Sequence, residues 1–146
     1  MLIRHKEKDI LGYLRHFPAV GMIGPRQCGK STLARQVVKK IKGSIYLDLE
    51  NPDDRVQLTD ASLFFSQHKG KLVCLDEVQF MPEIFRVLRS IIDQQKKNGQ
   101  FLLLGSASPP LLRQSSETLA GRIVYIDLAP FSLTELKKSN RSDTNR

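Results

Sequence analysis

Apolar residues along the chain occur in two alternating patterns. Short runs that are apolar throughout predict buried strands, whereas longer stretches with an apolar residue every three or four positions predict amphipathic helices. Gly, Pro and Asn residues separate many of these segments, as is typical of turns. The runs predict strands at residues 19–23, 44–49, 71–75, 101–104 and 123–128. The longer stretches predict helices at residues 2–16, 31–42, 55–67, 83–97 and 108–120.

Strands that alternate with helices of about 10–15 residues indicate βαβ units around a parallel sheet. Strands that are apolar on both faces agree with helices on both sides of that sheet. We therefore expect an α/β fold of three layers, with a five-stranded, mostly parallel sheet between helices. Such sheets bind ligands beyond the carboxyl ends of their strands, so the candidate chemistry is expected just after each strand.

The residues after the first predicted strand match a phosphate-binding pattern. Residues 24–31 (GPRQCGKS) fit G-x-x-x-x-G-K-[ST] and stand between a predicted strand and a predicted helix. The glycines allow a tight turn that points backbone N–H groups at phosphate oxygens, and the next helix directs its positive end at the same anion. Lys30 would reach the β- and γ-phosphates, and the Ser31 hydroxyl would bind Mg²⁺. The residues expected to contact nucleotide are Gly24, Pro25, Arg26, Gln27, Cys28, Gly29, Lys30, Ser31 and Thr32.

Two carboxylates follow the third predicted strand. Residues 72–75 (LVCL) precede Asp76 and Glu77, which is the Walker B pattern of four apolar residues and an acidic pair. Asp76 would hold Mg²⁺ through water, because this cation keeps much of its hydration. Glu77 would polarise a water for in-line attack on the γ-phosphate. Downstream of a phosphate loop, the pattern predicts a metal ligand and a general base.

Polar residues also stand beside the fourth and fifth predicted strands. In a core of this kind we expect strand order 5-1-4-3-2, which places the end of the fourth strand beside the γ-phosphate. Ser106 would then hydrogen-bond the phosphate or the attacking water, while Ser108 is suited to cap the following helix. Arg122 precedes the fifth strand, and we place it on the ligand edge of the sheet, where it would stabilise the charge of phosphoryl transfer in its own subunit or a neighbour's. A surface ion pair with a local acid is the alternative role for Arg122.

Length and composition narrow the setting of this chemistry. The chain has 146 residues and a net charge of +8, and its first twenty residues lack the apolar core of a secretion signal. No run approaches the roughly 18 consecutive apolar residues of a membrane span, so we expect a cytoplasmic protein without a membrane partner. The charge permits a nucleic-acid partner, but no basic stripe is interleaved with aromatic residues, and a basic surface with a solvated tail is the simpler account.

Five segments of the chain resemble the prokaryotic AAA+-type ATPases, and more specifically the group whose ATPase domain precedes a C-terminal domain of unknown function. The segments are GPRQCGKSTL, YLDLENPDDR, LVCLDEVQFMPEIFRVLR, LLLGSAS and LAGRIVYIDLAPFSLTEL. The resemblance covers about residues 3–136 and implies a P-loop core that uses ATP, rather than GTP, with Mg²⁺. The site residues that it implies are Lys30, Ser31, Asp76, Glu77, Ser106 as a sensor and Arg122 as an arginine finger.

Such ATPases continue into a helical lid and then the C-terminal domain. Residues 131–136 (FSLTEL) stand where the lid would begin, and residues 137–146 are polar and basic. We expect residues 1–136 to form the ATPase core and residues 137–146 to be a disordered tail, with the lid and the C-terminal domain absent.

Several functions use this set of residues. Mg²⁺-dependent ATP hydrolysis is the leading hypothesis. An ATP-binding regulatory switch, or a fragment with negligible turnover, is the alternative, because a missing lid leaves the site open to water. A small-molecule kinase shares the phosphate loop, but Glu77 favours water as the acceptor. A nucleic-acid-dependent motor and a homo-oligomer are left open by the sequence.

Overall fold

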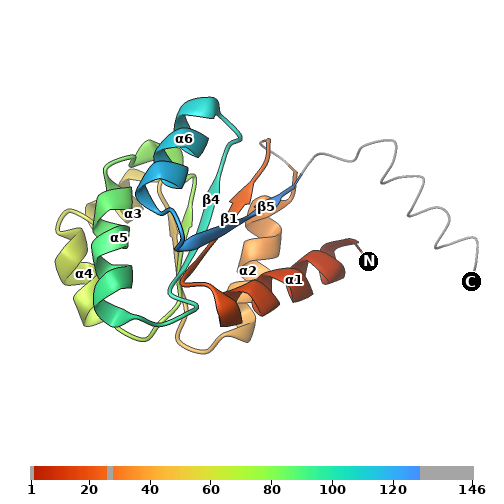
Figure 1. Cartoon of the computed structure of the whole chain (residues 1–146), viewed down its shortest axis with the longest axis horizontal. Coiled ribbons are helices and arrows are strands. Elements are labelled where there is room, and N and C mark those ends of the chain that lie inside the picture. The colour runs from red at the N-terminus through yellow and green to blue at the C-terminus, as the bar shows by residue number, and fades with distance from the viewer. Residues whose placement is uncertain (1, 26–27, 129–146) are drawn as a thin grey trace, which may run out of the picture.

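A five-stranded sheet lies at the centre of the molecule (Figure 1). The computed structural model describes residues 2–25 and 28–128 of the chain. All strand pairings are parallel, and the strand order is β2-β3-β4-β1-β5. Counted from β5, this is the predicted order 5-1-4-3-2, so the predicted α/β fold is confirmed. The strands are β1 Ala19–Ile23, β2 Ile45–Asp48, β3 Val73–Asp76, β4 Phe101–Gly105 and β5 Ile123–Asp127.

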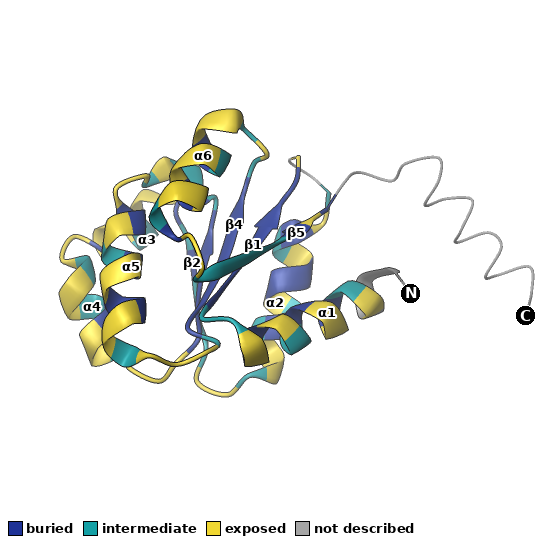
Figure 2. Cartoon of the chain, in the orientation of Figure 1, coloured by how far each residue is buried: buried dark blue, intermediate teal, exposed yellow. Residues whose placement is uncertain are grey.

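Helices cover both faces of the sheet and separate it from solvent. β1, β3 and β4 are buried along their whole length, whereas the outer surfaces of the helices are exposed (Figure 2). Along β4, Leu102 packs in a core with α1 and α2, and Leu103 packs in a second core with α4, α5 and α6. The helices are α1 Leu2–His16, α2 Lys30–Lys40, α3 Pro52–Val56, α4 Ala61–Gln67, α5 Ile84–Gln95 and α6 Pro109–Thr118.

The segment predicted as one helix at residues 55–67 forms two short helices. Asn51 begins α3, because its side chain accepts a hydrogen bond from the Asp53 N–H at 3.0 Å. Asp60 begins α4 in the same way, with its carboxylate 3.1 Å from the Leu63 nitrogen. The cap at Asp60, inside the predicted helix, therefore divides this stretch. A 3₁₀ helix, η1 (Val78–Phe80), also follows β3 where no element was predicted.

Two predictions concern the C-terminal residues, and another concerns the membrane. The expected lid start at residues 131–136 and the expected tail at residues 137–146 lie outside the described residues. Among the helices that the structure describes, none combines the length and the apolar character needed to cross a bilayer.

Candidate functional site

The carboxyl ends of β1, β3 and β4 meet at one edge of the sheet, which we call the carboxyl edge. β4 lies between β1 and β3, as expected. The Gly24 N–H donates to the Gly105 carbonyl at 3.3 Å, which joins the loop after β1 to the end of β4. The described parts of the loop (residues 24–25 and 28–31), the acidic pair after β3 and Ser106 therefore come to the same edge. Of the loop residues, Arg26 and Gln27 lie outside the described residues.

Two glycines of the loop at residues 24–31 are required for different reasons. Gly29 has φ 88°, in the left-handed region that favours glycine, and it immediately precedes α2. Gly24 is required for space, because a Cβ there would collide with the carbonyl oxygen of Leu128. The resulting turn presents the amino end of α2 at the carboxyl edge, where N–H groups without helical partners favour an anion.

Lys30 begins α2, and its side chain turns back over the loop. Its ammonium donates to the carbonyl oxygens of Gly24 at 2.8 Å and Pro25 at 2.6 Å, and lies 3.8 Å from Cys28 Sγ. Lys30 is only 5% exposed, and no carboxylate pairs with it within the described ranges. A buried cation without an acidic partner favours the approach of an anion. Thr32, two residues further along α2, is exposed.

Asp76 ends β3 and is held by two hydroxyl groups. Ser31 Oγ donates to Asp76 Oδ2 at 2.6 Å, and the Tyr46 hydroxyl donates to the same oxygen. Asp76 is 3% exposed, and its Oδ1 is buried without a hydrogen-bond partner. Burial and the hydrogen bond to Asp76 raise the pKa of Tyr46 far above its usual value, so its hydroxyl remains a donor. Burial also raises the pKa of the Cys74 thiol, which lies in the core.

The side chains at this point fit a hard divalent cation. Mg²⁺ takes oxygen ligands, usually one or two protein groups together with water and substrate phosphates. Ser31 Oγ and the unpartnered Asp76 Oδ1 are oxygens of this kind. Within the described part of the chain, no three His, Cys, Asp or Glu side chains gather into a metal-binding group. The site therefore suits a cation whose remaining ligands come from water and phosphate.

Glu77 lies at the point where β3 ends and η1 begins. Its backbone is left-handed, with φ 54°, which is uncommon for a residue other than glycine and is enriched at functional sites. Its half-buried side chain accepts a hydrogen bond through Oε2 from Gln79 Nε2. The other atom of that amide, Gln79 Oε1, is buried and has no hydrogen-bond partner.

Ser106 directly follows β4 and is half-buried. Its hydroxyl forms no hydrogen bond to another described residue, so it is available to a ligand at the carboxyl edge. Ser108 stands at the N-cap of α6, but its side chain makes no capping hydrogen bond.

The expected place of Arg122 on the ligand edge is wrong. Ala19 of β1 pairs with Ile123 of β5 in parallel register, so Arg122 lies where the strands begin. Its guanidinium binds Asp93 of α5 through two hydrogen bonds of 2.7 and 2.9 Å. This pair holds the pKa of Asp93 below its usual value. Arg122 therefore belongs to the edge opposite the phosphate loop of its own chain, and the ion-pair alternative describes its contacts.

Sequence reasoning missed two residues of this site, Tyr46 and Gln79. Tyr46 pairs with Cys74 in the β2–β3 register, so its ring lies on the same face as Asp76, two positions further on. The Arg35 guanidinium lies over the same ring, 5.1 Å from its centroid. A strand register cannot be read from one sequence, so the contact between Tyr46 and Asp76 had no signal in the residue pattern.

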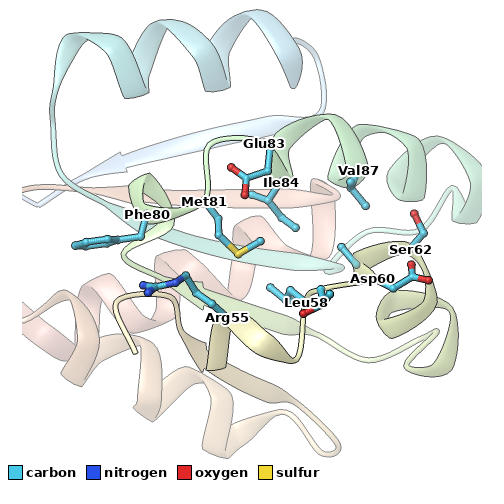
Figure 3. Close-up of a pocket in the computed structure, with 11 residues that line it drawn as sticks. Arg55, Leu58, Asp60, Ser62, Phe80, Met81, Glu83, Ile84 and Val87 are labelled. Carbon is cyan, nitrogen blue, oxygen red and sulfur yellow. The ribbon is translucent and has the colours of Figure 1, made fainter. Parts of the chain in front are cut away.

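A hollow of about 650 Å³ lies elsewhere, between the segment of α3 and α4 and the start of α5 (Figure 3). Its lining includes the apolar side chains of Leu58, Met81 and Ile84 and the charged side chains of Arg55 and Glu83. None of the residues predicted to bind phosphate or metal lines it. It is separate from the polar cluster at the carboxyl edge.

Curated relatives extend well beyond this chain. The uncharacterized proteins Rv2008c of Mycobacterium tuberculosis and Mb2031c of Mycobacterium bovis are each 40% identical to it over 126 residues. The match covers 86% of this chain but 28% of each relative. The chain thus spans little more than a quarter of the length of these relatives.

Solved structures with low sequence identity share the fold. A Walker-type ATPase of Pyrococcus abyssi is 16% identical to this chain, with a TM-score of 0.63. The match covers 96% of this chain and 58% of the ATPase. AMPPCP-bound DnaA from Aquifex aeolicus is 14% identical, with coverage of 99% and 49% and a TM-score of 0.61. Cdc6p from Pyrobaculum aerophilum is 12% identical, with coverage of 97% and 48% and a TM-score of 0.59.

A family assignment agrees with this fold and with the order of the motifs along the chain. Residues 16–137, most of the chain, match the family described as AAA domain. The chain therefore belongs to the AAA domain family, as a P-loop core of the AAA+ type.

Proposed function

We propose that this chain binds ATP with Mg²⁺ at the carboxyl edge and hydrolyses it to ADP and phosphate in the cytoplasm. The observation that carries the proposal is the buried Lys30 ammonium, without an acidic partner in the described ranges, beside the Ser31–Asp76 pair with its unpartnered oxygen. The AMPPCP bound to DnaA and the name of the Pyrococcus ATPase support the choice of nucleotide and reaction.

Lys30 and the backbone of the loop at residues 24–31 would bind the phosphates. The ammonium would exchange its hydrogen bonds to the Gly24 and Pro25 carbonyl oxygens for stronger, charge-assisted ones to the β- and γ-phosphates. Ser31 and Asp76 would hold Mg²⁺, whose charge offsets that of the phosphate oxygens. Nucleotide binding would thus supply the negative charge that the buried ammonium lacks as a partner.

Glu77 and Ser106 would act on the attacking water. The Glu77 carboxylate accepts a proton from a water molecule while the oxygen of that water attacks the γ-phosphorus in line with the departing ADP. The Ser106 hydroxyl, at the end of the neighbouring strand β4, hydrogen-bonds the γ-phosphate or that water. These roles explain why two polar side chains stand beside Asp76 at the ends of buried strands.

Calorimetric titration with a non-hydrolysable ATP analogue tests binding. The parent protein should bind the analogue in the presence of Mg²⁺, and Lys30→Ala should weaken binding at least about 100-fold, because it removes a charge-assisted contact to two phosphates. Lys39→Ala, which removes an exposed lysine of the same helix, should bind like the parent. Equal binding by Lys30→Ala and the parent would contradict the site.

Release of phosphate tests hydrolysis. Glu77→Gln should keep the affinity for the analogue and lose turnover by about 10²–10⁴-fold, the usual contribution of general-base catalysis. The alternative, an ATP-binding switch with negligible turnover, predicts a parent protein that binds the analogue but releases no phosphate. Turnover by Glu77→Gln as fast as by the parent would show that another group serves as base.

A further inference from the structure

Gln79 connects the proposed general base to the end of β4. It lies in η1, two residues after Glu77, and its Nε2 donates to Glu77 Oε2. Its Oε1 lies toward Gly105, since a Cβ built on Gly105 would stand 3.3 Å from that oxygen. Gly105 is the last residue of β4 and directly precedes Ser106. One amide group therefore spans the gap between the Glu77 carboxylate and the strand end that carries Ser106.

The chemistry of its neighbour fixes the orientation of this amide. An ionised carboxylate only accepts hydrogen bonds, so the Nε2 group must face Glu77 and Oε1 must face Gly105. Oε1 is then buried without a hydrogen-bond partner, which is unfavourable for a polar atom. Packing alone gives no reason for a polar side chain here, whereas the hydrogen bond to Glu77 does.

Gln79 provides the hydrogen bond that restricts the Glu77 side chain. Glu77 is half-buried, and its carboxylate forms no hydrogen bond to any other described residue. A free glutamate side chain samples several rotamers, whereas proton abstraction requires the carboxylate within hydrogen-bond reach of the attacking water. The Gln79 amide limits that sampling.

The geometry points to Gln79 as a positioning residue that holds the Glu77 carboxylate for the proposed hydrolysis. This inference rests on the proposed function, because it concerns the step that Glu77 performs there. A group that orients a base acts on the chemical step and makes no contact with the nucleotide, so it changes kcat and leaves nucleotide affinity unaltered.

Gln79→Met tests this role, because methionine keeps the length of the side chain and removes the donor. We expect kcat for phosphate release to fall about tenfold, while the Kd for the Mg²⁺-loaded, non-hydrolysable analogue stays within about twofold of the parent value. Gln79→Glu, which sets a second carboxylate against Glu77, should lower kcat further and provides a second variant of nearly the same shape. Gln94→Met makes the same change at an exposed position of α5 and should alter neither quantity.

A double variant separates positioning from a merely structural role. In the Glu77→Gln background, Gln79→Met should leave the residual turnover unchanged, since the base that it positions is already absent. Parent-like or faster turnover by Gln79→Met, or a loss of nucleotide affinity parallel to that of kcat, would overturn the inference alone. A parent protein that binds nucleotide without turnover would overturn the proposed hydrolysis and, with it, this role for Gln79.

Discussion

Arg122 and Lys30 are both cations near an edge of the sheet, yet the two edges surround them differently. At the amino edge, where the strands begin, Arg122 donates to both oxygens of Asp93. At the carboxyl edge, Lys30 contacts carbonyl oxygens and a thiol among the described residues, and one oxygen of Asp76 has no partner. The charge of Arg122 is paired with a carboxylate of the chain, whereas that of Lys30 has no acidic partner among the described residues.

The difference shows what separates a structural ion pair from a candidate site. One orphaned oxygen is not sufficient, because Gln100 Oε1 is also buried without a partner and stands just before β4, at the amino edge. The carboxyl edge combines the orphaned Oδ1 of Asp76 with the buried ammonium of Lys30. An unpartnered carboxylate oxygen and a cation without an acidic partner in one place indicate a ligand better than any single residue type.

Replacement of one aspartate by asparagine at each edge should give the largest difference in turnover and in Mg²⁺-dependent binding. Asp76→Asn removes the charge that would hold Mg²⁺, so we expect turnover to fall at least about 100-fold and analogue binding to lose its dependence on Mg²⁺. Asp93→Asn makes the same chemical change in the ion pair with Arg122 and should leave both quantities unaltered. Phosphate release and calorimetry with and without Mg²⁺ measure the two effects; equal losses in both variants would remove the distinction between the edges.

Glycine substitutions should show how tightly the carboxyl edge is built. A Cβ at Gly24 would collide with the carbonyl oxygen of Leu128, a backbone atom that cannot turn aside, so Gly24→Ala should destabilise the fold by about 1–3 kcal/mol. Gly12→Ala is the matched control, because no atom lies within 4 Å of a Cβ there and alanine favours the helical state of α1 by about 0.5–1 kcal/mol. Urea unfolding of both variants tests this; an equally stable Gly24→Ala would contradict the close approach.

Removal of a single hydroxyl should have a smaller effect at the same edge. Tyr46→Phe leaves Asp76 Oδ2 with the Ser31 hydrogen bond alone and keeps the aromatic ring that faces Arg35. Because groups that orient metal ligands commonly contribute 10–100-fold to affinity, we expect the Mg²⁺ concentration needed for analogue binding to rise about tenfold. Tyr13→Phe, at an exposed tyrosine, should leave that requirement unaltered, and an unaltered requirement in both variants would show that Ser31 alone orients Asp76.

The sequence predicted β1 and β4 well because their apolar runs are short, continuous and bounded by Pro or Gly. It also placed the loop at residues 24–31 and the acidic pair directly after β1 and β3, because those patterns consist of residues adjacent in the chain. It missed the contact of Tyr46, which depends on a strand register. It also missed the contact of Gln79 with Glu77, whose backbone is left-handed. The edge occupied by Arg122 had a signal that was overlooked, since a residue before a parallel strand lies at the amino edge.

The ion pair at the amino edge should have the smallest effect of all. Arg122 lowers the pKa of Asp93 in the folded protein, whereas the unfolded chain keeps the ordinary aspartate pKa of about 3.9. The stability from this pair is therefore fully present above that pH and is lost as the pH falls through the lower, folded value. Both side chains are solvent-accessible, so salt should screen the contribution and keep it small.

Arg122→Gln should make folding stability less dependent on pH in the acidic range without altering nucleotide binding. Thermal unfolding between about pH 5 and pH 2 should show a smaller loss of midpoint temperature in Arg122→Gln than in the parent, and added salt should reduce the difference. Arg113→Gln, at an exposed arginine of α6, should follow the parent curve. Matching curves for Arg122→Gln and the parent would mean that the neighbouring cations Arg89 and Lys96, which also lower the pKa of Asp93, suffice to keep its carboxylate charged. The pairing of charges would then no longer distinguish the amino edge from the carboxyl edge.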